Sequence, residues 1–306
     1  MKGALHQHSP RARRAFTLAE LLVVMGIIAL LATLTAISVE QVAGTSRLAT
    51  GTNTVMGALG EARAMAIKEN KPTCVAFAVF RANSAAPQQT IVVVAMATGR
   101  MLNLNPGSGA TDNDLIAEEF LPVDGLPVRR LPPGIKVAGP FTDYSQPQYG
   151  SSDDIWITQP EFSNSENGSM LVVRFGPDGG VQTRNPALPA NITPTAATDT
   201  AYASLWVDVD RDGLVDIGTT GGSSNGRFFD FDELGDEPVG DVVEFLAIFD
   251  DRDARERYNI AAWNPATGGG TNAAEDARRD DLTEYIDQFA DRIHFNRYTG
   301  VAGRLR

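Results

Sequence analysis

Four aspartates between residues 208 and 216 are spaced like the ligands of a calcium-binding loop. They are Asp208, Asp210, Asp212 and Asp216. Calcium takes roughly 6–8 oxygen ligands, so alternating carboxylates can converge on one ion. Gly213 stands where such loops turn, and Leu214 would contribute its backbone carbonyl. Without a cation the four carboxylates would repel one another. The spacing therefore predicts a calcium site.

The flanking residues differ from those of an EF-hand. The twelfth place is Thr219 instead of a bidentate glutamate, and residues 205–208 have the composition of a strand. We therefore expect a calcium loop between β elements, with Asp230, Asp232 or Glu233 completing the ligand shell. The alternative interpretation is a solvated acidic hairpin that holds no ion.

Glu20 is the second candidate for a chemical role, because it is an acid inside a long apolar run. Residues 16–39 are almost entirely apolar, and their number matches the roughly 20 residues that a helix needs to cross a bilayer. An acid at the centre of a bilayer costs about 2.5–3.5 kcal/mol on insertion scales. A secretory signal peptide has no use for such an acid. Another group must therefore compensate Glu20, and its nature would indicate the function.

The charges around this run predict its orientation. Basic residues precede it, and the first basic residue after it is Arg47; the preceding ones are Lys2, Arg11, Arg13 and Arg14. The positive-inside rule then leaves the N-terminus in the cytoplasm and exports the remainder. Since no second long apolar segment follows, we expect a protein that crosses the membrane once.

A helix is expected to continue beyond the apolar run, from residue 40 to residue 70. Residues at spacings of three and four share one helical face: Leu48, Thr52, Val55, Leu59, Ala62 and Ala66. Pro72 disfavours a helical conformation at Lys71, so the helix should end near Asn70.

The remaining residues, 71–306, indicate a loop-rich β domain. The chain has 306 residues, of which 29 are glycine and 17 are proline. Strands are predicted at 73–80, 90–97, 155–158, 170–175, 204–209 and 242–249, a turn at 98–99 and a short helix at 280–290. Cys74 is the single cysteine, so no internal disulfide forms, and its apolar neighbours predict a buried side chain.

Composition also weighs against several functional classes. The formal net charge of -12 argues against broad polyanion binding, although Arg292, Arg297, Arg304 and Arg306 could form a local basic patch. A Ser-His-Asp or Cys-His hydrolase would have to use His294, which more readily packs in a strand or faces solvent. We therefore expect no enzyme.

The N-terminal residues resemble the type IV prepilin signal. The basic leader is followed by Ala15 and then by Phe16-Thr17-Leu18-Ala19-Glu20, with Ala15 where the family usually has glycine. The resemblance implies that a prepilin peptidase removes the leader, residues 1–15, between Ala15 and Phe16 and that the new amine of Phe16 is methylated. It also implies that Glu20 meets the Phe16 amine of a neighbouring subunit during assembly.

Later segments resemble the GspH/FimT branch of pseudopilins and minor pilins. They are residues 59–72 before the first strand, 131–137, 173–179, and 293–300 followed by Arg304. This resemblance implies an α+β fold, a pilin-like lollipop in which a long N-terminal helix packs on an antiparallel β-rich head. Segments near 100–130, 138–168 and 185–285 are longer than expected and are interpreted as insertions.

The resemblance implies a structural subunit of a periplasmic filament. The chain would be a pseudopilin of a type II secretion system or a minor pilin of a type IV pilus, anchored in the inner membrane with a periplasmic head. Its partners would be other pilin or pseudopilin subunits, the prepilin peptidase and an inner-membrane assembly platform. The alternatives are a minor pilin whose head binds DNA or another substrate and, less favoured, a membrane-anchored hydrolase.

Overall fold

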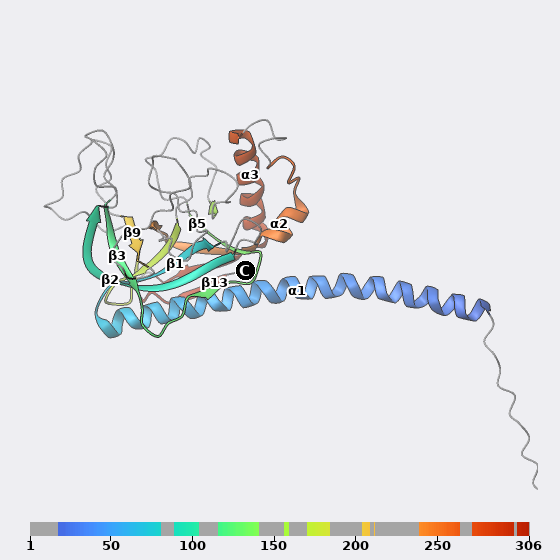
Figure 1. Ribbon diagram of the computed structural model, residues 1–306, viewed down its shortest axis with the longest axis horizontal. Helices are drawn as coiled ribbons and strands as arrows, with labels where there is room; N and C mark the ends of the chain where they lie inside the picture. The colour runs from blue at the N-terminus through green and yellow to red at the C-terminus, as the bar shows by residue number, and fades with distance from the viewer. Residues whose placement is uncertain are drawn as a thin grey trace, which may run out of the picture. The chain divides into compact units, whose positions relative to one another are not determined.

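The structure, a computed structural model, describes residues 18–80, 89–103, 116–140, 156–158, 170–183, 204–208, 211, 239–263, 271–296 and 299–305. The chain divides into two compact units, residues 1–45 and residues 46–306. In chain order the elements are α1 (Leu18–Glu69), β1 (Thr73–Phe80), β2 (Gln89–Asn103), β3 (Ile116–Pro122), β4 (Arg129–Arg130), β5 (Ile135–Pro140), β6 (Trp156–Thr158), β7 (Met170–Phe175), β8 (Val181–Gln182), β9 (Ser204–Val207), β10 (Val239–Val242), β11 (Phe245–Asp250), α2 (Asp251–Arg257), α3 (Thr271–Phe289), β12 (Asp291–Phe295) and β13 (Ala302–Leu305) (Figure 1). The fold is α+β, as predicted, with an N-terminal helix followed by a sheet domain in which most strand pairs are antiparallel.

Helix α1 ends where the sequence predicts. Its last residue is Glu69, and Asn70 adopts a left-handed conformation with φ of 51°. Asparagine tolerates this conformation, which commonly terminates helices. The backbone N–H of Lys71 then bonds back to the carbonyl of Ala66 at 3.3 Å. Pro72 follows and cannot continue the helix.

The largest sheet is closed on itself. Its strands follow the order β1, β2, β3, β9, β10 and β7, and β7 pairs again with β1. The strands β4 and β8 are added to β2 and β7. Neighbours are antiparallel except for β3 with β9 and β10 with β7, which are parallel. We call this closed set of six strands the ring.

Small side chains on β1 and β2 fit the narrow interior of the ring. Cys74, Ala76 and Ala78 on β1, with Ala95 and Ala97 on β2, belong to one buried cluster to which β3, β7, β9 and β10 also contribute. A barrel of so few strands has little internal width, which favours small residues. The alternating residues Val75, Phe77, Val92 and Val94 are larger and pack against α1.

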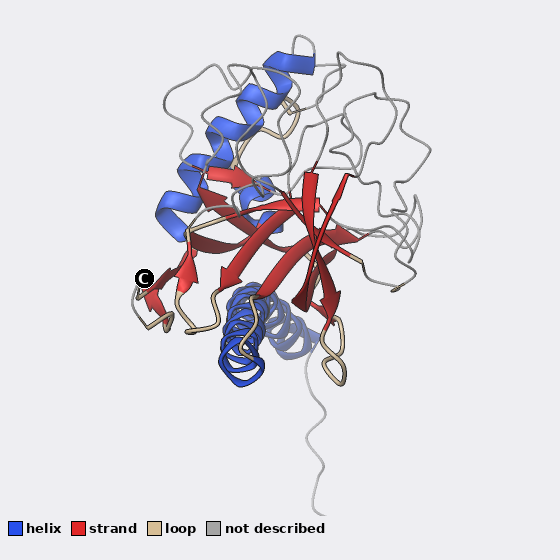
Figure 2. Cartoon of the chain, turned by 90° about the vertical axis from the view of Figure 1, so that its left-hand side faces the viewer, coloured by secondary structure: helices blue, strands red, loops and turns tan. Residues whose placement is uncertain are grey.

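The second sheet lies between two helices. Its order is β13, β12, β11, β5 and β6. Leu246 and Ile248 of β11 join the core formed with residues 55–66 of α1. The alternate residues Ala247 and Phe249 pack with α3 on the opposite face. Figure 2 shows helices on both sides of the strands. The period-two alternation of a strand therefore lets one strand serve two cores.

Three sequence-based predictions are corrected. The turn expected at residues 98–99 is instead a register shift inside β2, which continues to Asn103 with Gly99 at φ of 84°. Residues 242–249 belong to two strands, because β10 pairs in the ring and β11 in the second sheet. The predicted helix at 280–290 begins earlier, at Thr271.

The segments near residues 100–130 and 185–285, which were interpreted as insertions, contain regular elements of the fold. These segments supply β3, β9 and β10, which are three of the six ring strands. They also supply α2 and α3, which cover one face of the second sheet. These parts of the chain therefore contribute to both sheets and to the packing of the second one.

Candidate assembly helix and metal loop

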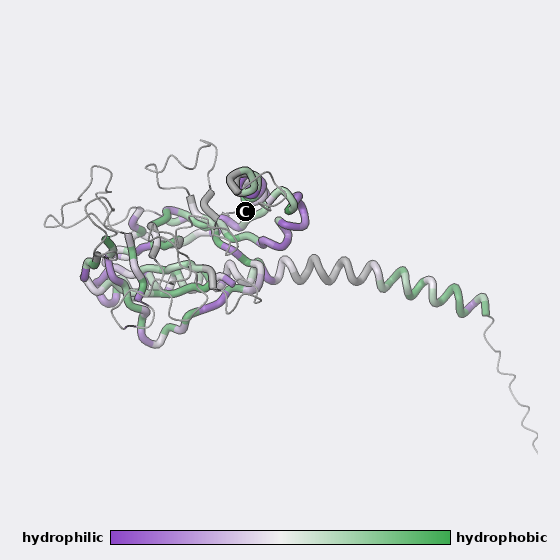
Figure 3. The backbone as a smooth tube through the Cα atoms, turned by 45° about the horizontal axis from the view of Figure 1, so that its top comes forward, coloured by the Kyte–Doolittle hydropathy of each residue, from purple (hydrophilic) through white to green (hydrophobic). Residues whose placement is uncertain are grey.

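The first helical turns of α1 expose a continuous apolar surface. Every large apolar side chain from Leu18 to Leu31 is 48–82 % exposed in the single chain. The green stretch at the N-terminal end of the helix in Figure 3 marks these residues. Soluble monomers rarely expose apolar patches of this size, and such patches mark interaction surfaces. Among the described residues, no helix has the length and mean hydropathy needed to cross a membrane.

Glu20 lies in the first turn of α1 and is exposed. A carboxylate is favourable there because the N-terminus of a helix carries partial positive charge. The predicted cleavage residues Ala15 and Phe16 lie outside the described residues. The structure therefore locates the acid of the motif at the very start of the helix, on its accessible surface.

The predicted calcium loop begins at a buried residue. Asp208 follows β9 and is 1 % exposed, and its backbone N–H donates to the carbonyl of Phe120 at 3.0 Å. Its Oδ1 accepts the backbone N–H of Arg211 at 2.5 Å, and Arg211 has φ of 70°. The other predicted ligands, Asp210, Asp212, Leu214 and Asp216, lie outside the described residues, as do Asp230, Asp232 and Glu233. Within the described ranges, no group of three or more metal-binding side chains occurs.

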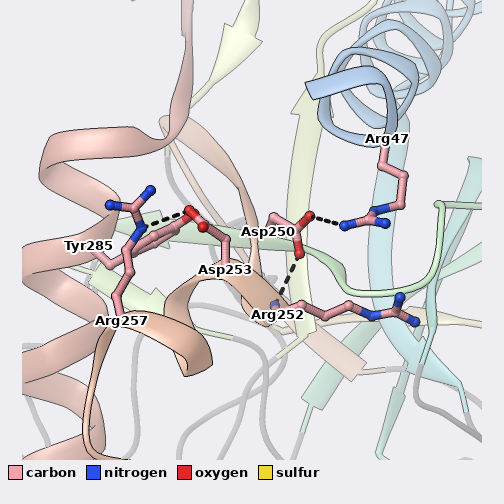
Figure 4. A network of polar contacts seen from close by, with 6 residues as sticks. All are labelled: Arg47, Asp250, Arg252, Asp253, Arg257 and Tyr285. Carbon is pink, nitrogen blue, oxygen red and sulfur yellow. Dashed lines mark hydrogen bonds and ion pairs between the residues drawn. The ribbon is translucent and has the colours of Figure 1, made fainter. Parts of the chain in front are cut away.

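Polar contacts fasten α2 to both large helices (Figure 4). Asp250, the N-cap of α2, accepts a bond from Arg47 of α1 at 3.2 Å and from the backbone N–H of Arg252 at 3.0 Å. Asp253 binds Arg257 at 2.9 Å and the phenol of Tyr285 in α3 at 2.7 Å. Burial and the bond to Asp253 raise the pKa of Tyr285, which keeps its phenol protonated as the donor.

A buried ion pair lies inside the ring. The Glu118 carboxylate of β3 accepts a bond from the Arg174 guanidinium of β7 at 2.7 Å, and both side chains are more than nine-tenths buried. Arg174 also donates to Gln182, while its Nε is buried with no partner among the described residues. Burial raises the pKa of Glu118, and the adjacent Arg174 opposes that increase. Sequence reasoning missed this pair, because its members are far apart in the chain.

A second buried ion pair links β5 to α2. Lys136 lies 3.4 Å from Asp251, which also accepts a bond from Arg255 at 2.8 Å. Burial lowers the pKa of Lys136, and Asp251 counteracts this effect. The contact fastens the start of α2 to the sheet beneath it.

Cys74 and His294, the residues that a hydrolase would have to use, lie in different surroundings. Cys74 is fully buried, as predicted, and burial raises the pKa of its thiol. His294 is exposed and stacks on Phe245 with ring centroids 5.6 Å apart.

Of the four arginines near the end, Arg292 binds Asp287 at 2.8 Å and Arg304 binds Asp291 at 2.5 Å, whereas Arg297 and Arg306 lie outside the described residues.

Comparison with known proteins concerns the N-terminal residues. Residues 10–36 match the prokaryotic N-terminal methylation motif. No curated protein and no solved structure matches the chain. The matched residues contain the predicted cleavage site, Glu20 and the start of the exposed apolar surface of α1. The chain carries a prepilin-type N-terminal methylation motif, which supports a type IV pilin-like protein and a structural subunit rather than an enzyme.

Proposed function

We propose that the chain is a pilin-like subunit of a periplasmic filament, either a pseudopilin of a type II secretion system or a minor pilin of a type IV pilus. The methylation motif at residues 10–36, which includes the exposed apolar turns of α1, carries the proposal. The same apolar surface serves first as an anchor in the inner membrane and then as the contact between subunits in the filament. Head-to-tail contacts that do not close generate filaments.

Glu20 is the proposed assembly residue. Cleavage between Ala15 and Phe16 would create a positive amine at the start of the mature chain. That amine can meet the Glu20 carboxylate of a neighbouring subunit, and Glu20 lies in the first turn of α1. Opposite charges attract strongly where water is excluded, and the pair offsets the cost of burying either charge alone. The contact would therefore fix the axial register between subunits.

The arrangement of the head supports the GspH/FimT branch within this proposal. Two of the segments that resemble that branch, 173–179 and 293–300, meet beside the last turns of α1. Gly300 approaches the carbonyl of Gly179, and Gly179 contacts Ile67 of the helix. Arg63 of α1 donates to the carbonyl of Thr299 at 2.6 Å. These two segments, which both resemble that branch, therefore lie together beside the same part of the helix.

Replacing Glu20 with alanine is expected to leave membrane association intact and to abolish incorporation into filaments. The apolar surface that anchors the helix is unchanged, whereas the partner of the Phe16 amine is lost. Fractionation of membranes and of sheared filaments from cells that express each variant measures the two properties separately. Glu69→Ala is the control, because it removes an exposed acid from the last turn of the same helix. Normal incorporation of Glu20→Ala would eliminate the pairing.

We also propose that the loop beginning at Asp208 binds calcium. The support is the spacing of Asp208, Asp210, Asp212 and Asp216, together with the attachment of the first of these residues to β3. Calorimetric titration of the full chain in detergent is expected to show binding, and millimolar calcium is expected to raise Tm because the ion binds the folded state. Asp212→Asn should abolish both effects, and Asp280→Asn, on the exposed face of α3, should abolish neither. The absence of heat and of a change in Tm for the unmodified chain would exclude the site.

Nucleic-acid binding by the head is less favoured than assembly. Arg292 and Arg304 are each engaged by an aspartate of the same chain, so binding a phosphate would require breaking an existing ion pair. Binding of this kind would appear as gel shifts that weaken as salt is added. The genes that flank the coding sequence distinguish a secretion system from a pilus.

A further inference from the structure

One buried carboxylate connects α1 to the end of the chain. Asp291, the first residue of β12, is 5 % exposed. It accepts a hydrogen bond from the hydroxyl of Thr52 in α1 at 2.8 Å. It also accepts bonds from the guanidinium of Arg304 in β13 at 2.6 and 2.5 Å. The hydroxyl of Thr52 therefore reaches the last strand through a single shared acid.

The hairpin of β12 and β13 contacts the same helix again farther along. Arg63 donates to the carbonyl of Thr299, in the turn between the two strands, at 2.6 Å. Thr52 and Arg63 are about 16 Å apart along the helix, at a rise of 1.5 Å per residue. Ile293 is buried in the core that contains Val55 and Leu59 of α1. The hairpin thus lies along three turns of helix, with polar contacts at both ends and apolar packing between them.

We propose that this hairpin is a latch that holds residues 46–69 of α1 on the head, with Arg304 as its positioning residue. Removal of Arg304 leaves Asp291 buried beside Thr52 without its cation. An ionised carboxylate in that position must be solvated, so water has to enter between the helix and β12. The helix then separates locally from the sheet.

The ring is expected to remain folded when the latch opens. Its six strands close on themselves, so none of them depends on the hairpin for a partner. Its interior cluster contains no residue of α1, β12 or β13. The latch would therefore govern how tightly the helix is held beside β12, while the apolar contacts between the helix and the ring remain. This behaviour concerns one chain and does not depend on whether the chain enters a filament.

Hydrogen exchange of the full chain in detergent micelles tests the latch. Arg304→Ala is expected to lower protection at the amides of residues 51–59 by at least about tenfold, the change expected for a lost hydrogen bond between charged groups. Amides of β1 and β2 in the ring should keep their protection. Arg292→Ala is the matched control, because it removes an arginine of the same hairpin that binds the exposed Asp287. Arg304→Lys should restore part of the protection.

Three results would overturn the proposal. Protection of residues 51–59 could remain unchanged in Arg304→Ala, or it could fall equally in the ring, which would indicate global destabilisation. The Arg292→Ala control could also produce the same loss. Thr52→Val provides a second variant if Arg304→Ala does not fold, since it removes only the hydroxyl and keeps the packing. It should produce a smaller loss of protection in the same amides, and no loss there would equally contradict the latch.

Discussion

Replacing Glu118 with alanine is expected to lower the free energy of unfolding by about 3–5 kcal/mol, the usual cost of removing one partner from a buried ion pair. Arg174 would keep its charge inside the ring and lose the carboxylate that binds it at 2.7 Å. Its Nε already has no partner among the described residues, so the bond to Gln182 would be left to stabilise the guanidinium. Urea unfolding followed by tryptophan fluorescence measures the loss, with the buried Trp206 of neighbouring β9 as one reporter.

A double variant separates the effect of losing the ion pair from the effect of leaving an unpaired charge buried. Glu118→Met combined with Arg174→Met removes both charges and leaves apolar chains of moderate length. Because apolar replacement of a buried pair is often neutral or stabilising, the double variant should be more stable than Glu118→Ala. A double variant that is less stable than the unmodified protein would show that the pair is more stabilising than apolar side chains, and one that is less stable than Glu118→Ala would contradict the prediction.

Replacing Gly300 with alanine is expected to destabilise the protein by roughly 2–5 kcal/mol, the sum of a left-handed backbone and an overpacked contact. Gly300 has φ of 65°, and an added Cβ would lie 1.9 Å from the carbonyl oxygen of Gly179. Since that oxygen belongs to backbone, no side-chain rotation can relieve the contact. The turn before β13 would have to move away from the turn between β7 and β8. Thermal unfolding measured by circular dichroism provides the comparison.

Gly99 offers a matched control for this substitution. Its φ of 84° is similarly left-handed, but an added Cβ would meet nothing within 4 Å. Gly99→Ala should therefore cost only the backbone part, about 1–2 kcal/mol. Equal losses in the two variants would mean that the close approach of Gly300 to Gly179 does not matter for stability.

Local sequence signals predicted several elements correctly. The strand at Thr73–Phe80 was identified from its continuous β-forming residues, and the end of α1 from Pro72. Cys74 was correctly predicted to be buried from its apolar neighbours. The segment from Ala15 to Glu20 could be recognised because its information lies in consecutive residues. The calcium site stays a prediction, because all of its predicted ligands except Asp208 lie outside the described residues.

The sequence by itself determined the methylation motif, the end of α1 and the boundaries of β1, since each depends on neighbouring residues. The α+β fold class was implied by the resemblance of its motifs to a known family. Only the tertiary structure decided that β1 returns to β7 and that β3, β9 and β10 complete the ring. It also decided that Glu118 meets Arg174 and that Asp291 meets both Thr52 and Arg304. These contacts join residues that are 13–239 positions apart, and no local propensity specifies such pairing. Their formation depends on how separate strands and helices bury their apolar faces together.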